Sequence, residues 1–273
     1  MYRTSTLGRL MGDLTALRRS LAEMDRVVAG FSGGADSAFL AWVASDTLGA
    51  DRVVAATAVS PSLAPSELAD CELLAREWGM QWLPVETQEM DRPEYVANGG
   101  DRCYHCKAEL LDTLAPIAAD LGATVVLGVN LDDLGDHRPG QTAAAERGAR
   151  FPLVESGFTK SDVRDASRRL GLRTWDKPAG ACLASRLPYG TPVTLQRLSS
   201  VAMAEEGLRA LGFRQLRVRH YGDLARIELA EADLVAAVGR RHELVAAVQA
   251  AGYRYVTLDL QGFRSGNLNQ ALQ

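Results

Sequence analysis

The segment FSGGADSAFL, Phe31–Leu40, constrains the fold of this chain more than any other. It joins a short apolar run to a helical pattern that continues to residue 49. Glycines between a strand and a helix let backbone amides approach an anion, and the helix N-terminus adds its positive dipole end. A carboxylate beside a phosphate suits a divalent cation between them, so Asp36 predicts Mg²⁺. The residues expected around the phosphate are Ser32, Gly33, Gly34 and Ser37.

The alternative for this segment is a strand-to-helix turn whose glycines serve backbone geometry alone. The rest of the first two-thirds of the chain favours the phosphate loop, because strand and helix patterns alternate there. This alternation implies right-handed crossovers and a parallel, doubly wound sheet, hence the α/β class. The expected strands cover residues 26–31, 52–60, 80–86 and 123–130, and the expected helices cover residues 36–49, 65–79 and 102–122.

After about Leu195 the pattern changes to that of a smaller α+β domain. Two strand patterns flank Gly222 and Asp223, and this dipeptide is a strong hairpin signal. A helix is expected before the hairpin, at residues 194–212, and another after it, at 231–252, followed by a strand at 253–260. We therefore expect two domains, at residues 1–192 and 193–273.

Composition narrows the class of protein. Of 273 residues, 47% are hydrophobic and 23% are charged, which is typical of a soluble globular protein. No apolar run reaches the roughly 20 residues that span a bilayer, and we expect a cytoplasmic protein without a membrane partner. The net charge of −4 lacks the basic surplus that phosphate contacts with long nucleic acids require, which argues against such a partner.

A second group of polar residues, GVNLDDLGDHRPG at 128–140, follows the fourth expected strand. Ligands of open α/β sheets bind at the carboxyl ends of the strands. Asn130, Asp132 and Asp133 are therefore candidates to bind Mg²⁺ or a ribose, and Arg138 to bind a carboxylate or phosphate through two hydrogen bonds. The alternative is a solvated acidic turn.

The four cysteines differ in their surroundings. Cys103 and Cys106 form a CxxC at the start of an expected helix, where thiolates are favoured. Redox, zinc and iron–sulfur chemistry all remain open for this pair, as does an inert pair without a chemical role. Cys182 lies in a glycine- and proline-rich loop with Arg186, which favours a thiolate and can also hold a phosphate. Cys71 has helical spacing typical of a buried hydrophobic residue.

In the C-terminal domain, Arg217 and Arg219 lie two residues apart on one strand and so share a face. Together with Arg264 they suit a substrate phosphate. The alternative is a solvated strand face with a cross-strand pair to Glu228, whose role stays open.

SGGADS resembles the SGGxDS pyrophosphate loop of the ATP pyrophosphatases, which include NAD synthetase and several tRNA-thiolating enzymes. The resemblance extends further in SGGADSA, GVNLDDLGDHRPG, FPLVESGFTKSDVR and DKPAGACLASRLPYG. Together these segments make nearly the whole chain similar to the LarE family of ATP-dependent sulfur transferases. Members of this family act in assembly of the nickel-pincer nucleotide cofactor.

The resemblance implies an adenine-nucleotide alpha-hydrolase-like fold and a nucleotide substrate, pyridinium-3,5-biscarboxylic acid mononucleotide. ATP with Mg²⁺ adenylylates a carboxylate and releases pyrophosphate. Sulfur then displaces AMP to leave a thiocarboxylate, and a second round converts the other carboxylate. The resemblance also implies a homo-oligomer, and it matches Cys182 to the family's sulfur-site cysteine. Together with the arguments from the residues above, it leads us to expect Asp36, Cys182 and Arg186 in the catalytic site.

The family has two sources of sulfur. In one branch, the cysteine that matches Cys182 gives up its own sulfur and becomes dehydroalanine. In the other, three cysteines hold a [4Fe–4S] cluster that accepts sulfide from a sulfur donor. Since this chain has Cys103 and Cys106 as well as Cys182, we expect the cluster branch.

Three other functions compete with this expectation. A tRNA-thiolating enzyme would share the loop and three cysteines but should have a basic face. An ammonia-using ligase such as NAD synthetase has no need of the cysteines. A non-catalytic adenine-nucleotide sensor with structural zinc would bind ATP without releasing pyrophosphate.

Overall fold

A computed structural model describes residues 12–135, 139–178 and 180–264. The chain forms two compact units, each built from three segments. The first unit contains Met1–Thr57, Cys71–Leu83 and Leu111–Lys177, and the second contains Ala58–Asp70, Pro84–Leu110 and Pro178–Gln273. The division of the chain into domains at residues 192 and 193 stays a prediction.

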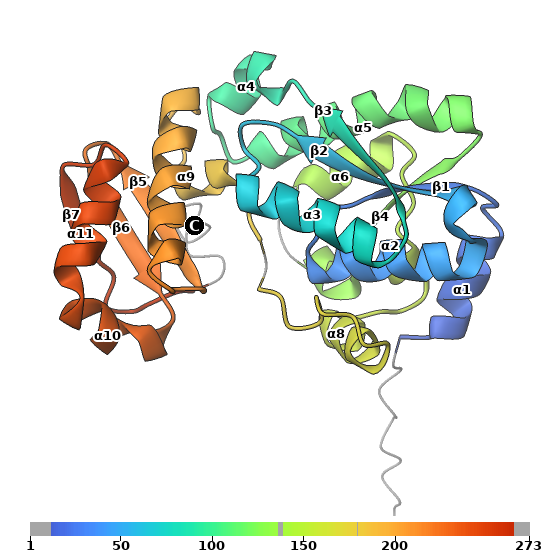
Figure 1. The fold of residues 1–273 in the computed structure, drawn as a ribbon. Coiled ribbons are helices and arrows are strands. Elements are labelled where there is room, and N and C mark those ends of the chain that lie inside the picture. The colour runs from blue at the N-terminus through green and yellow to red at the C-terminus, as the bar shows by residue number, and fades with distance from the viewer. Residues whose placement is uncertain (1–11, 136–138, 179, 265–273) are drawn as a thin grey trace, which may run out of the picture. The chain divides into compact units, whose positions relative to one another are not determined.

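A four-stranded sheet carries the glycine loop of segment Phe31–Leu40 (Figure 1). Its strands are β1 (Val27–Gly30), β2 (Val53–Val59), β3 (Gln81–Glu86) and β4 (Thr124–Leu127), in the order β3-β2-β1-β4. β1 pairs in parallel with both β2 and β4. This confirms the α/β class and the parallel sheet, and all four strands lie where the sequence predicts them.

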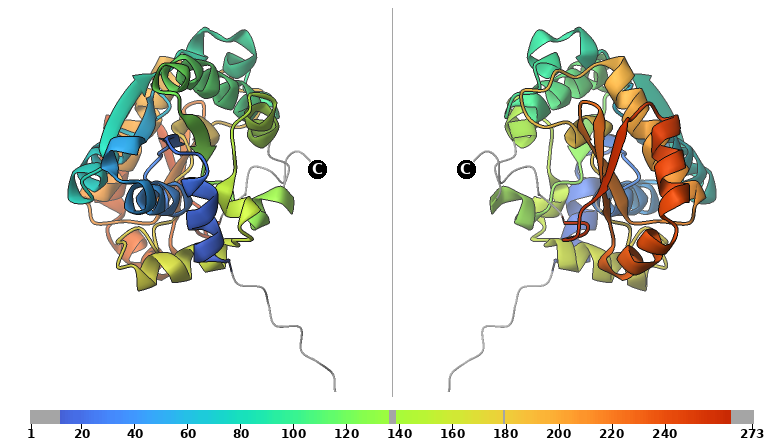
Figure 2. Two further views of the ribbon diagram at one scale, coloured as in Figure 1. Left: turned by 90° about the vertical axis from the view of Figure 1, so that its right-hand side faces the viewer. Right: turned by 90° about the vertical axis from the view of Figure 1, so that its left-hand side faces the viewer.

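Helices cover both faces of this sheet, with α2 and α3 on one face and α5 on the other (Figures 1 and 2). The chain moves from β1 to β2 to β3 in one direction and then returns past β1 to β4, so right-handed crossovers place α5 opposite α2 and α3. α5 continues past Pro116 as one helix. The helices here are α1 (Leu14–Ala22), α2 (Ala35–Leu48), α3 (Pro65–Glu77), α4 (Pro93–Val96), α5 (Arg102–Leu121), α6 (Pro139–Glu146), α7 (Pro152–Glu155) and α8 (Lys160–Arg169). Short 3₁₀ turns lie at Ala50–Arg52, Glu89–Asp91 and Leu131–Gly135.

The core of the first unit forms around α2. This helix is apolar on nearly all sides, as expected for one enclosed by other elements. The Phe39 ring on α2 lies 5.4 Å from the Phe158 ring, between centroids, and both side chains are buried. Leu17 and Leu21 of α1 belong to the same core, which fixes the helix that follows the glycine loop.

The second unit contains a three-stranded sheet, ordered β5-β6-β7. β5 (Leu216–Tyr221) and β6 (Leu224–Leu229) form the expected antiparallel hairpin around Gly222 and Asp223, and β7 (Tyr255–Leu258) pairs in parallel with β6. The helices of this part are α9 (Leu195–Ala210), α10 (Leu234–Gly239) and α11 (Arg241–Ala250), and 3₁₀ turns lie at Leu183–Arg186 (η4) and Glu231–Asp233 (η5).

The prediction of a single helix over residues 231–252 is wrong. The segment is divided into η5, α10 and α11, and the break lies at Arg240, with φ −103° and ψ 23°. Gly239 weakens the helix just before the break. The Arg240 guanidinium donates from Nη1 to the Leu211 carbonyl oxygen at 2.8 Å, so a tertiary contact holds the break in place.

No helix within the described residues is long and apolar enough to cross a membrane. The cytoplasmic location stays a prediction.

Replacing Phe39 by alanine should lower the free energy of unfolding by about 3–5 kcal/mol, because a fully buried ring in a packed core leaves a cavity. Urea unfolding followed by circular dichroism measures this change. Phe39→Leu, which keeps much of the volume, should lose markedly less. An equal loss in both variants would contradict the role given to the ring.

Candidate functional site

The glycine loop lies at the point where the strand order of the sheet reverses. β1 has β2 on one side and β4 on the other, and the crevice beyond the carboxyl ends of such strands binds ligands in open α/β sheets. A Cβ on Gly128, just after β4, would stand 2.8 Å from the backbone N of Ser37 and 2.8 Å from the carbonyl carbon of Asp36. Glycine therefore lets the exit of β4 contact the start of α2.

The backbone of the loop is shaped for an anion. Gly33 has φ +67°, a conformation that glycine adopts without strain. Gly34 is the N-cap of α2 and provides no side chain, so the first amides of the helix have no side-chain cap. These amides, with the positive end of the helix dipole, make the site expected for a phosphate.

The two serines brace the loop. Ser37 Oγ donates to the Gly34 carbonyl oxygen at 3.2 Å and accepts from the Ser32 backbone N at 3.2 Å. The Ser32 hydroxyl lies 3.0 Å from Ser37 Oγ and completes the arrangement as a donor. Below the loop, the fully buried Cys71 behaves as its spacing predicts, and its Sγ lies 3.0 Å from the position of a Cβ on Gly33.

Asp36 connects the glycine loop to the acidic loop. Its Oδ1 accepts a hydrogen bond from Asn130 Nδ2 at 3.1 Å. Burial raises the pKa of the Asp36 carboxyl, Lys160 opposes that rise, and the charge of Asp133 adds to it. Two carboxylates in a desolvated site favour a divalent cation, the role that the sequence predicts for Asp36.

The acidic loop is held by its own hydrogen bonds. Asp133 Oδ2 accepts from the Asn130 backbone N at 3.2 Å, and Asn130 Oδ1 accepts from the Asp132 N at 3.0 Å. Asp132 Oδ2 also accepts from the Lys160 N at 2.8 Å, which ties the loop to the start of α8. The structure thus brings Asn130 to Asp36 and fixes Asp132 and Asp133 nearby. Arg138 lies outside the described residues.

Three cations at this site were not predicted from the sequence. Lys160 and Arg164 both act electrostatically on Asp36, and they lie one turn apart on α8. Arg164 Nε is buried without a hydrogen-bond partner in the described structure. Lys177 Nζ lies 3.6 Å from the position of a Cβ on Gly33. The i, i+4 spacing of Lys160 and Arg164 does show in the sequence that the two cations share a helix face. Nothing in the neighbouring sequence indicates that this face meets the glycine loop.

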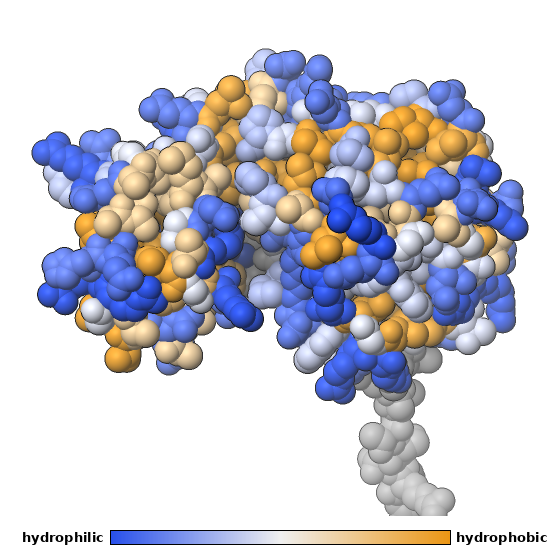
Figure 3. Space-filling view, in the orientation of Figure 1, coloured by the Kyte–Doolittle hydropathy of each residue, from blue (hydrophilic) through white to orange (hydrophobic). Residues whose placement is uncertain are grey.

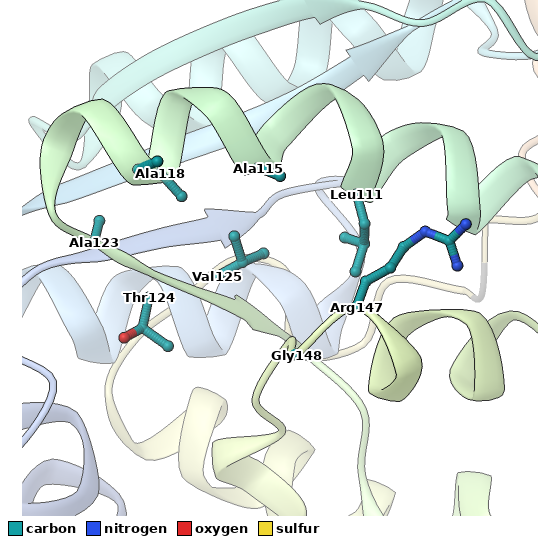
Figure 4. A pocket seen from close by; sticks show the side chains of 9 residues that line it. Leu111, Ala115, Ala118, Ala123, Thr124, Val125, Arg147 and Gly148 are labelled. Carbon is teal, nitrogen blue, oxygen red and sulfur yellow. The ribbon is translucent and has the colours of Figure 1, made fainter.

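A separate groove of about 330 Å³ lies where α5 packs over the first residues of β4 (Figure 4). Small apolar side chains line it, and apolar residues also gather on the surface over α5 in Figure 3. Arg147, at its rim, is paired with Asp112 at 2.7 Å. The acidic loop follows the other end of β4, so the groove is not part of the nucleotide site.

The three candidate sulfur ligands all belong to the second unit. Cys103 is the second residue of α5 and Cys106 the fifth, and Cys182 directly precedes η4. Cys106 and Cys182 pack against the same apolar cluster, which includes Tyr95. Burial, followed by the effect of Cys182, raises the pKa of the Cys106 thiol to about 12. Sequence spacing alone does not indicate that Cys182 approaches the CxxC.

Arg102, another residue that sequence reasoning missed, connects these segments. Its Nη1 donates to Asn98 Oδ1 at 2.5 Å and to the Ala184 carbonyl oxygen at 2.9 Å, and its Nη2 lies 3.9 Å from Cys103 Sγ. One buried guanidinium thus contacts the CxxC and the turn that follows Cys182.

The donor chemistry of the three cysteines fits an iron–sulfur cluster. In the part of the chain that the structure describes, no three His, Cys, Asp or Glu side chains converge as ligands of a single metal ion. A four-iron cluster makes a different demand, because each thiolate binds a different iron. Three soft thiol donors in one neighbourhood therefore suit the cluster better than a tetrahedral zinc ion, which needs four ligands.

Two of the predicted anion-binding arginines are engaged by carboxylates. Arg186 contacts Glu205 through two hydrogen bonds, from Nε at 2.8 Å and from Nη2 at 3.1 Å. Arg219 contacts Glu228 in the same way, with both distances at 3.0 Å, and its Nη1 donates to the Ser185 carbonyl oxygen at 2.9 Å. The cross-strand pair considered as an alternative for Glu228 is therefore present, and it is buried.

Arg217 differs from these two because no described carboxylate pairs with it. Its guanidinium stacks over the Phe263 ring at 4.4 Å from the centroid, and its Nη1 reaches the Arg264 carbonyl oxygen at 3.4 Å. Burial, with added repulsion from Arg186 and Arg219, lowers the pKa of Arg217 to about 10. The Arg264 side chain is exposed and donates to Gln261 Oε1.

Comparison with known proteins finds one matching family model and relatives that are similar over nearly the whole chain. The NAD synthase family model matches residues 15–97, which contain the glycine loop. An uncharacterised protein of Synechocystis is 49% identical over 266 residues, covering 96% of this chain and 99% of the relative. The pyridinium-3,5-bisthiocarboxylic acid mononucleotide synthase of Lactiplantibacillus plantarum is 39% identical over 254 residues, covering 93% of this chain and 92% of the relative. An uncharacterised protein of Methanocaldococcus jannaschii is 25% identical over 256 residues.

Asp36→Asn should make the unliganded protein more stable at neutral pH. Because burial raises the pKa of this carboxyl, the folded state binds more protons than the unfolded state at pH values between the ordinary and the raised pKa. Stability conferred by Asp36 therefore falls as pH rises through that window, and the penalty persists above it. Thermal unfolding measured from pH 4 to pH 8 should give a higher melting temperature for the variant than for the wild type at pH 8, and this difference should disappear at the acid end.

The exposed Asp51 provides the matched control, since Asp51→Asn should follow the wild-type profile. An Asp36→Asn variant that is less stable than the wild type at pH 7 would contradict the burial argument.

Proposed function

Because the chain belongs to the LarE family, we propose that it is an ATP-dependent sulfur transferase acting on pyridinium-3,5-biscarboxylic acid mononucleotide. The reaction would convert the two carboxylates of this substrate to thiocarboxylates, one per ATP. The observation that carries the proposal is the hydrogen bond of Asn130 to Asp36, which joins an anion-binding loop to an acidic loop where the sheet order reverses. The relative from Lactiplantibacillus supports the substrate through its name.

The first step activates a carboxylate. A carboxylate resists nucleophiles because its oxygen is a poor leaving group, whereas AMP leaves readily once its phosphorus is bonded to that oxygen. The carboxylate oxygen bonds to the α-phosphorus of ATP as the bond to the β-phosphate oxygen breaks, and pyrophosphate leaves. The amides at residues 32–37 would hold the departing phosphates, and Asp36 with Asp133 would hold Mg²⁺.

The three cations of the first unit would add charge to this step. Lys160 and Arg164 act on Asp36, and Lys177 reaches the glycine loop. Pyrophosphate gains negative charge as it leaves. Cations that are already in place therefore stabilise the transition state more than they stabilise the bound ATP.

In the second step a sulfur atom attacks the acyl carbon. The C–S bond forms, the C–O bond to AMP breaks, and a thiocarboxylate results. We propose that Cys103, Cys106 and Cys182 would hold a [4Fe–4S] cluster, which when bound supplies sulfide to the acyl group. In the alternative, the Cys182 thiolate attacks directly, and elimination across its Cα and Cβ then leaves dehydroalanine in the chain. Arg186 orients the turn after Cys182, since its Nη1 donates to the Ala181 carbonyl oxygen at 2.7 Å.

The substrate phosphate is assigned to Arg217, with Arg264 beside it. Arg219 has a different task in this proposal, because its donors are occupied by Glu228 and Ser185. It fixes the strand, and its charge is one of the causes that lower the pKa of Arg217. We also propose that residues 193–273 form the substrate-phosphate domain and contribute to a homo-oligomer.

Other functions have less support. The match to the NAD synthase family ends at residue 97, before Cys103. It therefore includes the glycine loop, which serves the ATP chemistry that both families share, and none of the three proposed sulfur ligands. A tRNA-thiolating enzyme should carry a basic surplus, whereas this chain has a net charge of −4.

Anaerobic incubation with ATP, Mg²⁺ and the biscarboxylate mononucleotide tests the proposal. The expected products are AMP, pyrophosphate and a substrate whose oxygen is replaced by sulfur, as detected by mass spectrometry. Ser37→Ala should abolish pyrophosphate release, and Cys182→Ala should retain that release but form no thiocarboxylate. Thiocarboxylate formed by Cys182→Ala at the wild-type rate would remove Cys182 from the mechanism.

Arg217→Met should raise KM for the mononucleotide by roughly 10- to 100-fold, because a charge-assisted contact to phosphate contributes about 1.5–3 kcal/mol. The same variant should bind the dephosphorylated nucleoside as weakly as the wild type does. Arg254→Met is the matched control, since Arg254 stacks on Tyr255 away from β5. A KM effect of equal size on both substrates would exclude a phosphate contact by Arg217.

A further inference from the structure

We propose that Arg102 is the counter-charge of the sulfur site, a fixed cation that stabilises the negative charge of a cluster held by Cys103, Cys106 and Cys182. This inference rests on the proposed function and concerns a residue that no part of it uses. It is carried by the surroundings of the Arg102 guanidinium, which no described carboxylate neutralises.

Burial of this charge needs an explanation. Arg102 is only 4% exposed, and removing a guanidinium from water is costly unless an anion compensates it. Its two oxygen partners, on Asn98 and Ala184, are neutral. Arg186 and Arg219, the comparable buried arginines of this unit, are each paired with a glutamate.

The partner of the Arg102 guanidinium, in place of a carboxylate, is a cysteine sulfur. Nη2 of Arg102 lies 3.9 Å from Cys103 Sγ, within hydrogen-bonding distance for sulfur. Its Nη1 reaches the Ala184 carbonyl oxygen in the turn after Cys182. The guanidinium therefore contacts one of the three proposed sulfur ligands and the turn that follows another.

The start of α5 provides a second favourable interaction. α5 is a 20-residue helix that begins at Arg102, so Cys103 and Cys106 lie at the positive end of its dipole. A cluster with three thiolate ligands carries negative charge, and here it would meet a helix N-terminus and a buried cation together.

Arg102 also contacts the loop that follows Cys182. Asn98, which accepts from Arg102, donates from Nδ2 to the Pro188 and Thr191 carbonyl oxygens, both at 2.8 Å. Arg102 could therefore act through structure alone, by holding this loop. The experiment must separate its charge from its hydrogen bonds.

Three substitutions make that separation. Arg102→Gln and Arg102→Met remove the charge, and glutamine retains a donor for the Ala184 carbonyl oxygen. Arg102→Lys retains the charge without the forked geometry. Arg92→Lys and Arg92→Gln are the matched controls, because Arg92 belongs to the same unit and pairs with Glu109 at 2.7 Å.

The measurements are iron content, acid-labile sulfide and the midpoint potential of the reconstituted proteins, with circular dichroism as the test of folding. Reduction adds negative charge, so loss of a nearby cation should lower the potential. We expect at least a tenfold shift of the redox equilibrium in the Gln and Met variants, which is about 59 mV for one electron. The Lys variant and both Arg92 variants should remain close to the wild type.

Each result has a separate meaning. An unchanged potential in Arg102→Gln or Arg102→Met overturns the role of Arg102 and leaves the proposed function intact. If the neutral variants do not fold, a tenfold shift in Arg102→Lys overturns it as well. A wild type that forms thiocarboxylate without iron excludes the cluster and this inference together, and a wild type that forms none contradicts the proposed function itself.

Discussion

The contact of Gly128 with the first residues of α2 is the constraint on which the nucleotide site depends. It places the exit of β4 against the backbone of Asp36 and Ser37, at the distance that a side chain would prevent. The glycine loop and the acidic loop then share one crevice, and Asn130 can reach Asp36. Lys160 joins the same group through Asp132, so one close approach of backbone assembles anion-binding amides, carboxylates and cations.

In the second unit, charge is distributed in two ways. Glu205 and Glu228 are both fully buried. Each holds a buried arginine through two hydrogen bonds and a second, less buried arginine through an ion pair, which fixes the elements around them. Arg102 and Arg217 are buried as well, but no described carboxylate pairs with them. Burying a cation without a paired anion is costly, and an anionic ligand offsets that cost. The paired residues thus provide structure, and it is for the other two that we propose anionic ligands.

Local patterns predicted the fold well because they depend on neighbours in sequence. The strand before Ser32, the helix after Gly34 and the turn at Gly222 all follow from periodicity and backbone preference. The break at Arg240 was missed because a carbonyl nearly thirty residues away stabilises it. In the sequence, Arg217 and Arg219 look equally suited to bind a phosphate, because they share one strand face. Only the fold determines which of them Glu228 engages. The three cysteines of the proposed sulfur site were chosen by residue type, whereas the contact of Arg102 with the turn after Cys182 joins residues about eighty positions apart and has no local signal.

The three-segment construction of the second unit has a consequence for the order in which the protein matures. Ser62, Tyr95 and Arg102 are synthesised early. The Ser62 carbonyl oxygen can accept its hydrogen bond from the Leu183 backbone N, and Arg102 can donate to the Ala184 carbonyl oxygen, only after those later residues have been added. The CxxC therefore leaves the ribosome long before the third cysteine and the turn that encloses it. During that interval the two thiols of α5 would be an incomplete set of the proposed cluster ligands. Under the proposed assignment, the timing of synthesis limits when the growing chain could first take up iron and sulfide.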